Sequence, residues 1–135
     1  MNTERRILLV EDSAPIRLRL IELLNIPGAM HVAATVETEL DAHDQIEIHD
    51  FDVLVVDVQL RQGSGIGAVR DARARWGILA PALIIVLTNH SYPTVRQHCF
   101  AAGADHFLDK SRQFDQVVPL IMGWNDGTEG RRRPN

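Results

Sequence analysis

The sequence alternates between two kinds of apolar segment, and this alternation limits the possible folds more than any other feature. Segments of the first kind are short and continuous, as in the run from Val53 to Val56, which is typical of a strand buried on both faces of a parallel sheet. Segments of the second kind carry apolar residues at helical spacing. The expected strands cover residues 6–10, 30–35, 53–56, 81–88 and 104–110.

Helix boundaries follow from capping and helix-breaking residues. Ser13 is expected to cap the first helix, which ends before Pro27, and Gly103 is expected to end the fourth helix. The last helical stripe runs from Phe114 to Met122. It contains Pro119, which predicts a kink or another alteration of that helix.

Five strand–helix pairs within about 124 residues predict a doubly wound α/β fold, with a five-stranded parallel sheet, right-handed crossovers and helices on both faces. The length of 135 residues suits one domain with its own core. We expect residues 1–124 to form this domain. Residues 125–135 are expected to be a flexible tail, with Arg131 to Arg133 solvated.

Composition narrows the function classes. The formal net charge of -4 gives no general attraction to nucleic acid or to an anionic membrane. The single cysteine, Cys99, cannot form an internal disulfide, and no apolar run reaches the length of a membrane span. We therefore expect a cytoplasmic protein that neither binds nucleic acid directly nor inserts into a membrane.

Polar residues stand where the predicted strands end. Because the carboxyl ends of parallel strands gather at one crevice, we expect these side chains to share a pocket. Clustered carboxylates repel one another, and Mg²⁺, which prefers oxygen ligands, relieves the repulsion. Zinc is disfavoured because no Cys and His stand at ligand spacing. The strand-end residues are Glu11, Asp12, Asp57, Thr88, Asp109 and Lys110.

Three of these residues suit phosphoryl transfer. Lys110 supplies a positive charge and Thr88 a hydroxyl, which are the groups that the oxygens of a transferred phosphoryl group need. Asp57 is the candidate nucleophile and would form an aspartyl phosphate.

Four segments carry a resemblance to a known family. They read LLVEDSAPIR, VLVVDVQLRQGSG, IIVLTNH and GADHFLDKS, in this order along the chain. Together they resemble the receiver domain of bacterial two-component response regulators over roughly residues 5 to 124. The resemblance implies the flavodoxin-like (βα)5 fold and a single-domain response regulator, a signalling protein rather than an enzyme that turns over small molecules.

The resemblance also assigns roles. Glu11 and Asp12 would hold Mg²⁺ together with the Asp57 carboxylate and the backbone carbonyl of Gln59. Asp57 would accept a phosphoryl group from a sensor histidine kinase or a histidine phosphotransfer protein, and Lys110 would pair with that group. The chain could then act as a shuttle in a phosphorelay, as a phosphate sink, or as an allosteric binder of a kinase or another target.

Switching would follow phosphorylation. Thr88 would move toward the phosphoryl group, and Phe107 would swing inward behind it. The surface of the fourth helix, fifth strand and fifth helix would then bind a downstream target protein, and the same face offers a route to a homodimer.

The sequence departs from the family pattern at several positions. Glu11 replaces the commoner Asp, and Arg61 and Ser111 stand where proline is frequent. His90 would flank the phosphoryl group together with Gln59 and tune its hydrolysis.

Two other functions are compatible with parts of the sequence. A degenerate receiver that acts only as a protein-binding module remains open, because Arg61, Ser111 and Pro119 depart from the pattern. A phosphatase of the haloacid dehalogenase type is disfavoured, because its second acid would fall at Gln59, which cannot titrate.

Overall fold

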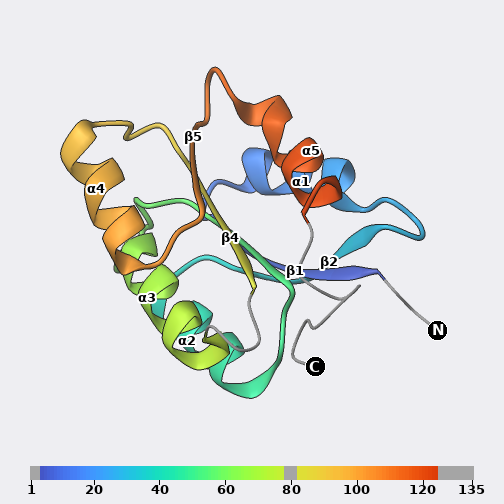
Figure 1. The fold of residues 1–135 in the computed structure, drawn as a ribbon, viewed down its shortest axis with the longest axis horizontal. Coiled ribbons are helices and arrows are strands. Elements are labelled where there is room, and N and C mark those ends of the chain that lie inside the picture. The colour runs from blue at the N-terminus through green and yellow to red at the C-terminus, as the bar shows by residue number, and fades with distance from the viewer. Residues whose placement is uncertain (1–3, 78–81, 125–135) are drawn as a thin grey trace.

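The computed structural model describes residues 4–77 and 82–124, so the predicted tail at 125–135 lies outside the described residues. Strands and helices alternate along the chain (Figure 1). The strands are β1 (Arg5–Val10), β2 (Met30–Val36), β3 (Val53–Val56), β4 (Leu83–Thr88) and β5 (His106–Asp109). The helices are α1 (Ala14–Leu24), α2 (Glu39–Ile48), α3 (Gly65–Trp76), α4 (Pro93–Ala102) and α5 (Val117–Met122), with a 3-10 helix η1 (Phe114–Gln116) before α5.

The strands form one parallel sheet in the order β2-β1-β3-β4-β5. The chain therefore starts near the middle of the sheet, winds first toward β2, and then crosses back to build β3, β4 and β5 on the other side. This order confirms the predicted doubly wound α/β fold. It also places the point where the winding reverses between β1 and β3, which is where such sheets bind ligands.

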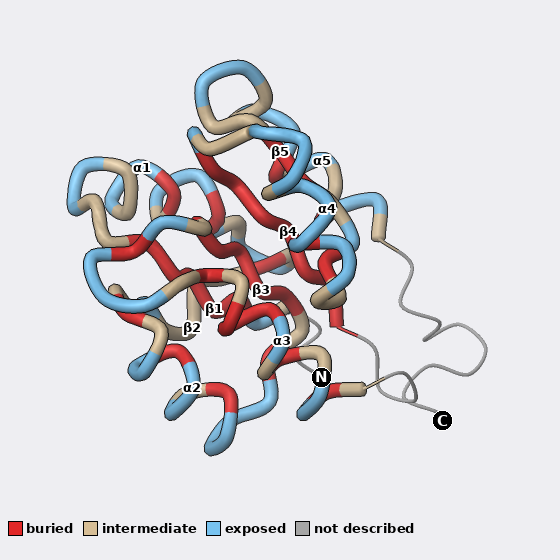
Figure 2. The backbone as a smooth tube through the Cα atoms, turned by 90° about the vertical axis from the view of Figure 1, so that its left-hand side faces the viewer, coloured by how far each residue is buried: buried red, intermediate tan, exposed pale blue. Residues whose placement is uncertain are grey.

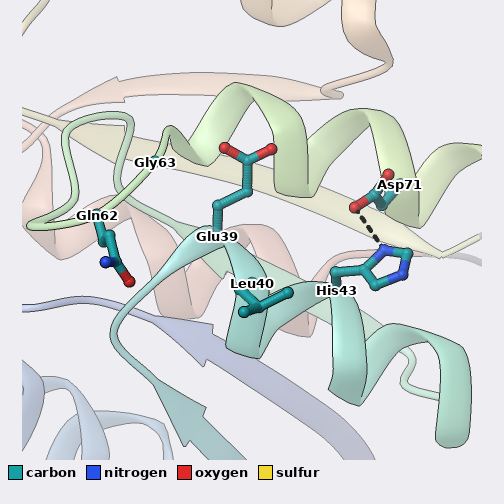
Figure 3. A pocket seen from close by; sticks show the side chains of 6 residues that line it. All are labelled: Glu39, Leu40, His43, Gln62, Gly63 and Asp71. Atoms are coloured by element: carbon teal, nitrogen blue, oxygen red, sulfur yellow. Dashed lines mark hydrogen bonds and ion pairs between the residues drawn. The ribbon is translucent and has the colours of Figure 1, made fainter.

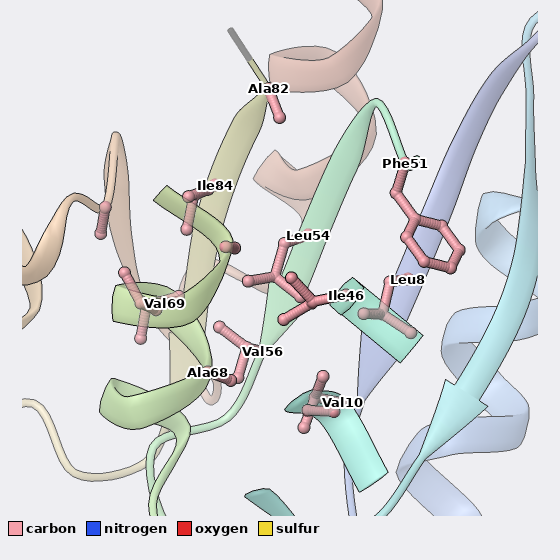
Figure 4. Close-up of a cluster of buried hydrophobic side chains, with 14 of the residues drawn as sticks. Leu8, Val10, Ile46, Phe51, Leu54, Val56, Ala68, Val69, Ala82 and Ile84 are labelled. Atoms are coloured by element: carbon pink, nitrogen blue, oxygen red, sulfur yellow. The ribbon is translucent and has the colours of Figure 1, made fainter. Parts of the chain in front are cut away.

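Two hydrophobic clusters cover the two faces of the sheet. Successive strand residues point to opposite faces, so in β1 the side chains of Leu8 and Val10 enter one cluster and those of Ile7 and Leu9 enter the other. The first cluster lies beneath α2, α3 and α4, and Figure 4 shows part of it around Leu54. The second lies beneath α1 and α5. Figure 2 shows the central strands as the buried interior, with exposed segments on the outer helices.

The capping predictions hold for the first and fourth helices. The Ser13 hydroxyl accepts a hydrogen bond from the Ile16 backbone N–H at 3.5 Å, and α1 ends at Leu24, before Pro27. Gly103 follows α4 with φ of 122°, a left-handed conformation that glycine adopts without steric cost.

The last helix is shorter than its apolar stripe. The segment from Phe114 to Gln116 forms a 3-10 turn, and α5 begins only at Val117. Pro119 is therefore the third residue of α5, within the first turn, where backbone N–H groups have no partner inside the helix. At this position the proline removes no interior hydrogen bond, and the alteration of the predicted helix is the 3-10 turn that precedes α5.

Other boundaries differ by a few residues. β5 is shorter than the predicted 104–110, and β4 begins at Leu83 rather than at residue 81, which lies outside the described residues. No described helix combines the length and the apolarity that a membrane span requires.

Candidate functional site

The carboxyl ends of four strands bring the predicted site residues together. Backbone hydrogen bonds extend the strand pairing past the strand ends: Asp57 N–H donates to the Val10 carbonyl at 3.0 Å, and Lys110 N–H donates to the Thr88 carbonyl at 2.9 Å. β1, β3 and β4 end on buried residues, so the residues that follow them are anchored. Glu11 is fixed in the same way, by donating its N–H to the Val36 carbonyl at 3.0 Å.

An ion-pair cluster lies at the centre of this site. The Lys110 ammonium lies 2.7 Å from Asp57 Oδ2 and 2.9 Å from Glu11 Oε1. All three side chains are buried, with exposed fractions of 8% for Lys110, 9% for Asp57 and 2% for Glu11. In such a low-dielectric setting each charge depends on its partners, because an unpaired buried charge is costly.

The pKa values of Glu11 and Lys110 are both raised. Burial raises the pKa of Glu11, and its hydrogen bond to Lys110 opposes that rise only in part. Burial works against the charged form of Lys110, but the hydrogen bonds to Asp57 and Glu11 outweigh it, so the pKa of the ammonium is raised. Lys110 is therefore positively charged throughout the neutral range.

Three carboxylates of this site are close enough to share a cation. Glu11, Asp12 and Asp57 each offer an oxygen, and these oxygens lie within 4.8 Å of one another. The second oxygen of Asp57, Oδ1, is buried and has no hydrogen-bond partner among the described residues. A buried oxygen without a partner is unusual and needs an explanation. A carboxylate-only donor set suits a hard cation such as Mg²⁺.

The loop after β3 closes over Asp57. Gly65 N–H donates to the Val58 carbonyl at 2.7 Å, and Gln59 and Ser64 form an antiparallel bridge. A side-chain carbon built at Gly65 would lie 1.9 Å from the Asp57 carbonyl oxygen, so only glycine fits there. Gln59 itself is exposed, at the mouth of the site.

Thr88 and Phe107 lie on the same face of the sheet. Phe107 pairs in register with Val86, two residues before Thr88, and both Phe107 and Val86 belong to the cluster beneath α3 and α4. Phe107 is buried, and its ring centroid lies 6.5 Å from that of Phe100. The Thr88 hydroxyl oxygen accepts a hydrogen bond from the His90 N–H at 3.1 Å.

Sequence reasoning missed the role of Glu39. Its carboxylate reaches from the start of α2 to the loop before α3, where Oε1 accepts a hydrogen bond from the Ser64 N–H at 2.8 Å. Side-chain carbons at Gly63 and Gly67 would meet this carboxylate at 2.7 and 2.0 Å. The glycines at 63 and 67 hinted at a close approach, but nothing in the sequence identified Glu39 as the group that approaches.

A groove of about 450 Å³ lies between α2 and α3, away from the ion-pair cluster. Figure 3 shows the residues around it, with His43 pointing to Asp71 across the groove at 3.0 Å. Within the described residues, the acidic cluster at Asp57 is the one group of three potential metal ligands, and none of it lines this groove. The groove is therefore separate from the candidate functional site.

Comparisons with known proteins agree with this geometry. Residues 7–121 match the response regulator receiver domain family. The transcriptional regulatory protein PdtaR of Mycobacterium tuberculosis is 31% identical over 117 residues, which cover 87% of this chain and 55% of PdtaR. The chain thus spans about half the length of that relative.

Two further proteins match this chain over at least 90% of their own length. The chemotaxis protein CheY of Bacillus subtilis is 28% identical over 116 residues, which cover 86% of this chain and 93% of CheY. The crystal structure of the response regulator domain of Thermotoga maritima CheB superposes with a TM-score of 0.70 at 25% identity, covering 87% of this chain and 90% of that one.

These matches, together with the sheet order and the strand-end cluster, define the class of protein. The chain belongs to the response regulator receiver domain family of two-component systems. Proteins of this family are signalling phosphoacceptors and typically bind Mg²⁺ at an acidic pocket.

Proposed function

We propose that this chain is a phosphoacceptor switch in which Asp57 receives a phosphoryl group and a distant surface then changes its affinity for a partner. The observation that carries the proposal is the state of the two Asp57 oxygens. Oδ2 is held by Lys110 at 2.7 Å, whereas Oδ1 is buried without a hydrogen-bond partner among the described residues. Because Lys110 fixes one oxygen, the carboxylate has a set orientation, and its second oxygen is left for a bond to phosphorus or to a cation.

The metal ligands follow from the acidic cluster. Glu11, Asp12 and Asp57 would hold Mg²⁺ through their carboxylates and Gln59 through its backbone carbonyl. Bound there, Mg²⁺ would neutralise the carboxylates and the phosphoryl oxygens. This assignment is supported because the available donors are all oxygen atoms, which are the ligands that Mg²⁺ prefers.

The chain's own groups perform the transfer. An oxygen of Asp57 attacks the phosphorus of the donor, the bond from phosphorus to the donor breaks, and the leaving group departs with its electron pair. Lys110 stabilises the charge on the transferred group, since its ammonium already contacts the acceptor carboxylate. The donor is a sensor histidine kinase or a histidine phosphotransfer protein.

The change then spreads through β4 and β5. Thr88 turns toward the phosphoryl group, and Phe107 follows into the space behind it. We assign the output to the face made by α4, β5 and α5, which binds a downstream target protein or a second copy of the chain. The shared sheet face of Thr88 and Phe107 supports this route.

We further propose that residues 1–124 work as a cytoplasmic receiver domain. The match to 93% of the length of Bacillus subtilis CheY supports such an arrangement. The effect would then pass through another protein rather than through direct contact with nucleic acid.

A phosphorylation-independent binding module is the alternative. The ion pairs of Lys110 with Asp57 and Glu11 favour it, because they balance part of the buried charge without any ligand. In such a module the cluster would only stabilise the fold.

Intact-mass spectrometry after incubation with acetyl phosphate and Mg²⁺ separates the two functions. The switch predicts one phosphoryl adduct that is lost with EDTA and in Asp57→Asn. A folded protein that gains no adduct from acetyl phosphate or from a phosphorylated histidine phosphotransfer protein would support the binding module instead.

A further inference from the structure

The Asp109 carboxylate, at the end of β5, is the most heavily hydrogen-bonded side chain beside the ion-pair cluster. Its Oδ1 accepts from the Ser111 N–H at 2.8 Å, the Ser111 hydroxyl at 2.6 Å and the Arg112 N–H at 3.2 Å. Its Oδ2 accepts from the Ser91 hydroxyl at 2.5 Å. The hydroxyls of Ser111 and Ser91 hold the pKa of Asp109 well below its usual range, so this carboxylate is ionised at any pH at which the protein functions.

The two oxygens of Asp109 serve different parts of the chain. Oδ1 bonds only to residues that follow within three positions, so it shapes the turn after β5. Oδ2 bonds to Ser91, which lies 18 residues earlier, in the loop between β4 and α4. A single side chain therefore ties together two loops that leave the sheet at the same end, as Figure 1 shows for β4 and β5.

Both loops carry residues of the candidate site. Ser91 is three residues from Thr88, and the intervening His90 N–H is bonded to the Thr88 hydroxyl oxygen. Asp109 directly precedes Lys110, whose N–H is bonded to the Thr88 carbonyl. The hydrogen bond between Ser91 and Asp109 therefore closes a ring that runs from Thr88 through His90 and Ser91 to Asp109 and Lys110, and from the Lys110 N–H back to the Thr88 carbonyl.

The geometry points to Asp109 as a positioning residue that holds the loop after β4 against the loop carrying Lys110, so that Thr88 and Lys110 approach the acceptor together. This inference rests on the proposed phosphoacceptor function. Without the tether, the loop containing His90 and Ser91 has more conformations to lose on reaching the transition state, and phosphorylation slows.

The chain supplies a matched control for the test. Ser91→Ala removes only the hydroxyl that donates to Asp109 Oδ2 and leaves the turn around Oδ1 complete. Ser111→Ala also removes a hydroxyl that donates to the Asp109 carboxylate, but that hydroxyl belongs to the local turn. Ser91→Thr keeps the hydroxyl and serves as the rescue variant.

The measurement is the rate constant of adduct formation with acetyl phosphate at saturating Mg²⁺, followed by quenched intact-mass spectrometry. We expect Ser91→Ala to be slower by about threefold or more, a size that couplings between contacting residues reach. Ser91→Thr and Ser111→Ala are expected to stay within about twofold of wild type. Equal rates for Ser91→Ala and wild type, or equal slowing in Ser91→Ala and Ser111→Ala, would overturn the inference.

Hydrogen exchange of the unphosphorylated proteins separates this inference from the proposed function. The tether predicts faster exchange at residues 89–92 in Ser91→Ala and no change there in Ser111→Ala. A wild-type protein that takes up no phosphoryl group would refute the proposed function, and with it the catalytic consequence of the tether. Unchanged exchange in Ser91→Ala beside a wild-type protein that is phosphorylated would refute the tether alone.

Discussion

The Lys110 ammonium lies 2.7 Å from one oxygen of Asp57, and the other oxygen of the same carboxylate is buried without a hydrogen-bond partner among the described residues. This relationship gives Lys110 two tasks. It pairs with the carboxylates of Asp57 and Glu11 and balances part of their charge when no ligand is bound, and it lies beside the carboxylate that would receive the phosphoryl group.

Removal of the Lys110 charge should destabilise the protein in a way that Mg²⁺ corrects. In EDTA, Lys110→Met leaves two buried carboxylates uncompensated, and we expect the free energy of unfolding to fall by about 3 kcal/mol. Added Mg²⁺ should raise the stability of the variant more than that of wild type, because the cation replaces the missing charge. Urea denaturation with EDTA or Mg²⁺ measures both effects.

Arg61→Met is the control for that experiment. Arg61 is 60% exposed, and its ion pair with Glu37 contributes little, so the variant should stay within about 0.5 kcal/mol of wild type. An equal gain from Mg²⁺ in wild type and in Lys110→Met would contradict the claim that the cation replaces the missing Lys110 charge.

Substitution by alanine should destabilise the protein at both Gly65 and Gly67, but only the loss at Gly67 should be relieved by a second substitution. Gly65→Ala forces a methyl group against the Asp57 carbonyl oxygen, a backbone atom that cannot move away. Gly67→Ala meets the end of the Glu39 side chain, so the double variant with Glu39→Ala should recover part of the lost stability. We expect the free energy of unfolding of each single variant to fall by about 1–3 kcal/mol, as it does at overpacked sites.

Gly123→Ala supplies the comparison for the glycine variants. A side-chain carbon there would meet the Pro119 carbonyl oxygen at 3.3 Å, so the neighbour has to give by only a few tenths of an ångström. Thermal denaturation should place this variant near wild type. A Gly65→Ala protein as stable as Gly123→Ala would show that the loop after β3 is not closed over Asp57.

The His43 and Asp71 pair should make stability depend on pH. The hydrogen bond between His43 and Asp71 raises the pKa of His43 above 6.5, and the neighbouring carboxylates of Glu47 and Asp44 act in the same direction. Because the folded-state pKa is the higher one, the pair's contribution is fully present below pH 6.5 and is lost as pH rises through the raised value.

NMR titration of the histidine rings tests this assignment. Asp71→Asn should lower the pKa of His43 toward its ordinary value. An unchanged His43 titration in Asp71→Asn would show that the pair does not form in solution.

His90 should influence how long the phosphoryl group lasts. Its backbone is fixed by the hydrogen bond to Thr88, which keeps the residue at the rim of the site. We expect His90→Ala to speed hydrolysis of the adduct by about threefold or more, because a smaller side chain admits water more easily. His98→Ala, on α4, is the control. Equal hydrolysis rates for His90→Ala and wild type would end this hypothesis.

The residues at strand ends were the most predictable part of the site. Parallel strands end at a common edge, so the positions of Glu11, Asp57 and Lys110 at the ends of apolar runs were sufficient to place them together. The switching movements of Thr88 and Phe107 and the metal contact of Gln59 came from the resemblance to the family, and they remain predictions.

The contacts made by long side chains were not predictable. Glu39 reaches a loop 25 residues away, and Asp109 reaches Ser91 rather than the acidic cluster. Such contacts depend on how two loops or helices pack, which periodicity and spacing do not describe. Pro119 shows a related limit: the apolar stripe gave the last helix its buried face, but the start of α5 was decided by the 3-10 turn before it.

The most direct test of the account is chemical mapping of the phosphorylated residue. The protein is incubated with acetyl phosphate and Mg²⁺ and treated with borohydride, which reduces an acyl phosphate to an alcohol, and peptide mass spectrometry then locates the reduced side chain. We predict reduction at Asp57 alone, and none when EDTA replaces Mg²⁺. Reduction at Asp12 or Asp109 instead, or at no residue of a protein that carries the adduct, would contradict Asp57 as the phosphoacceptor.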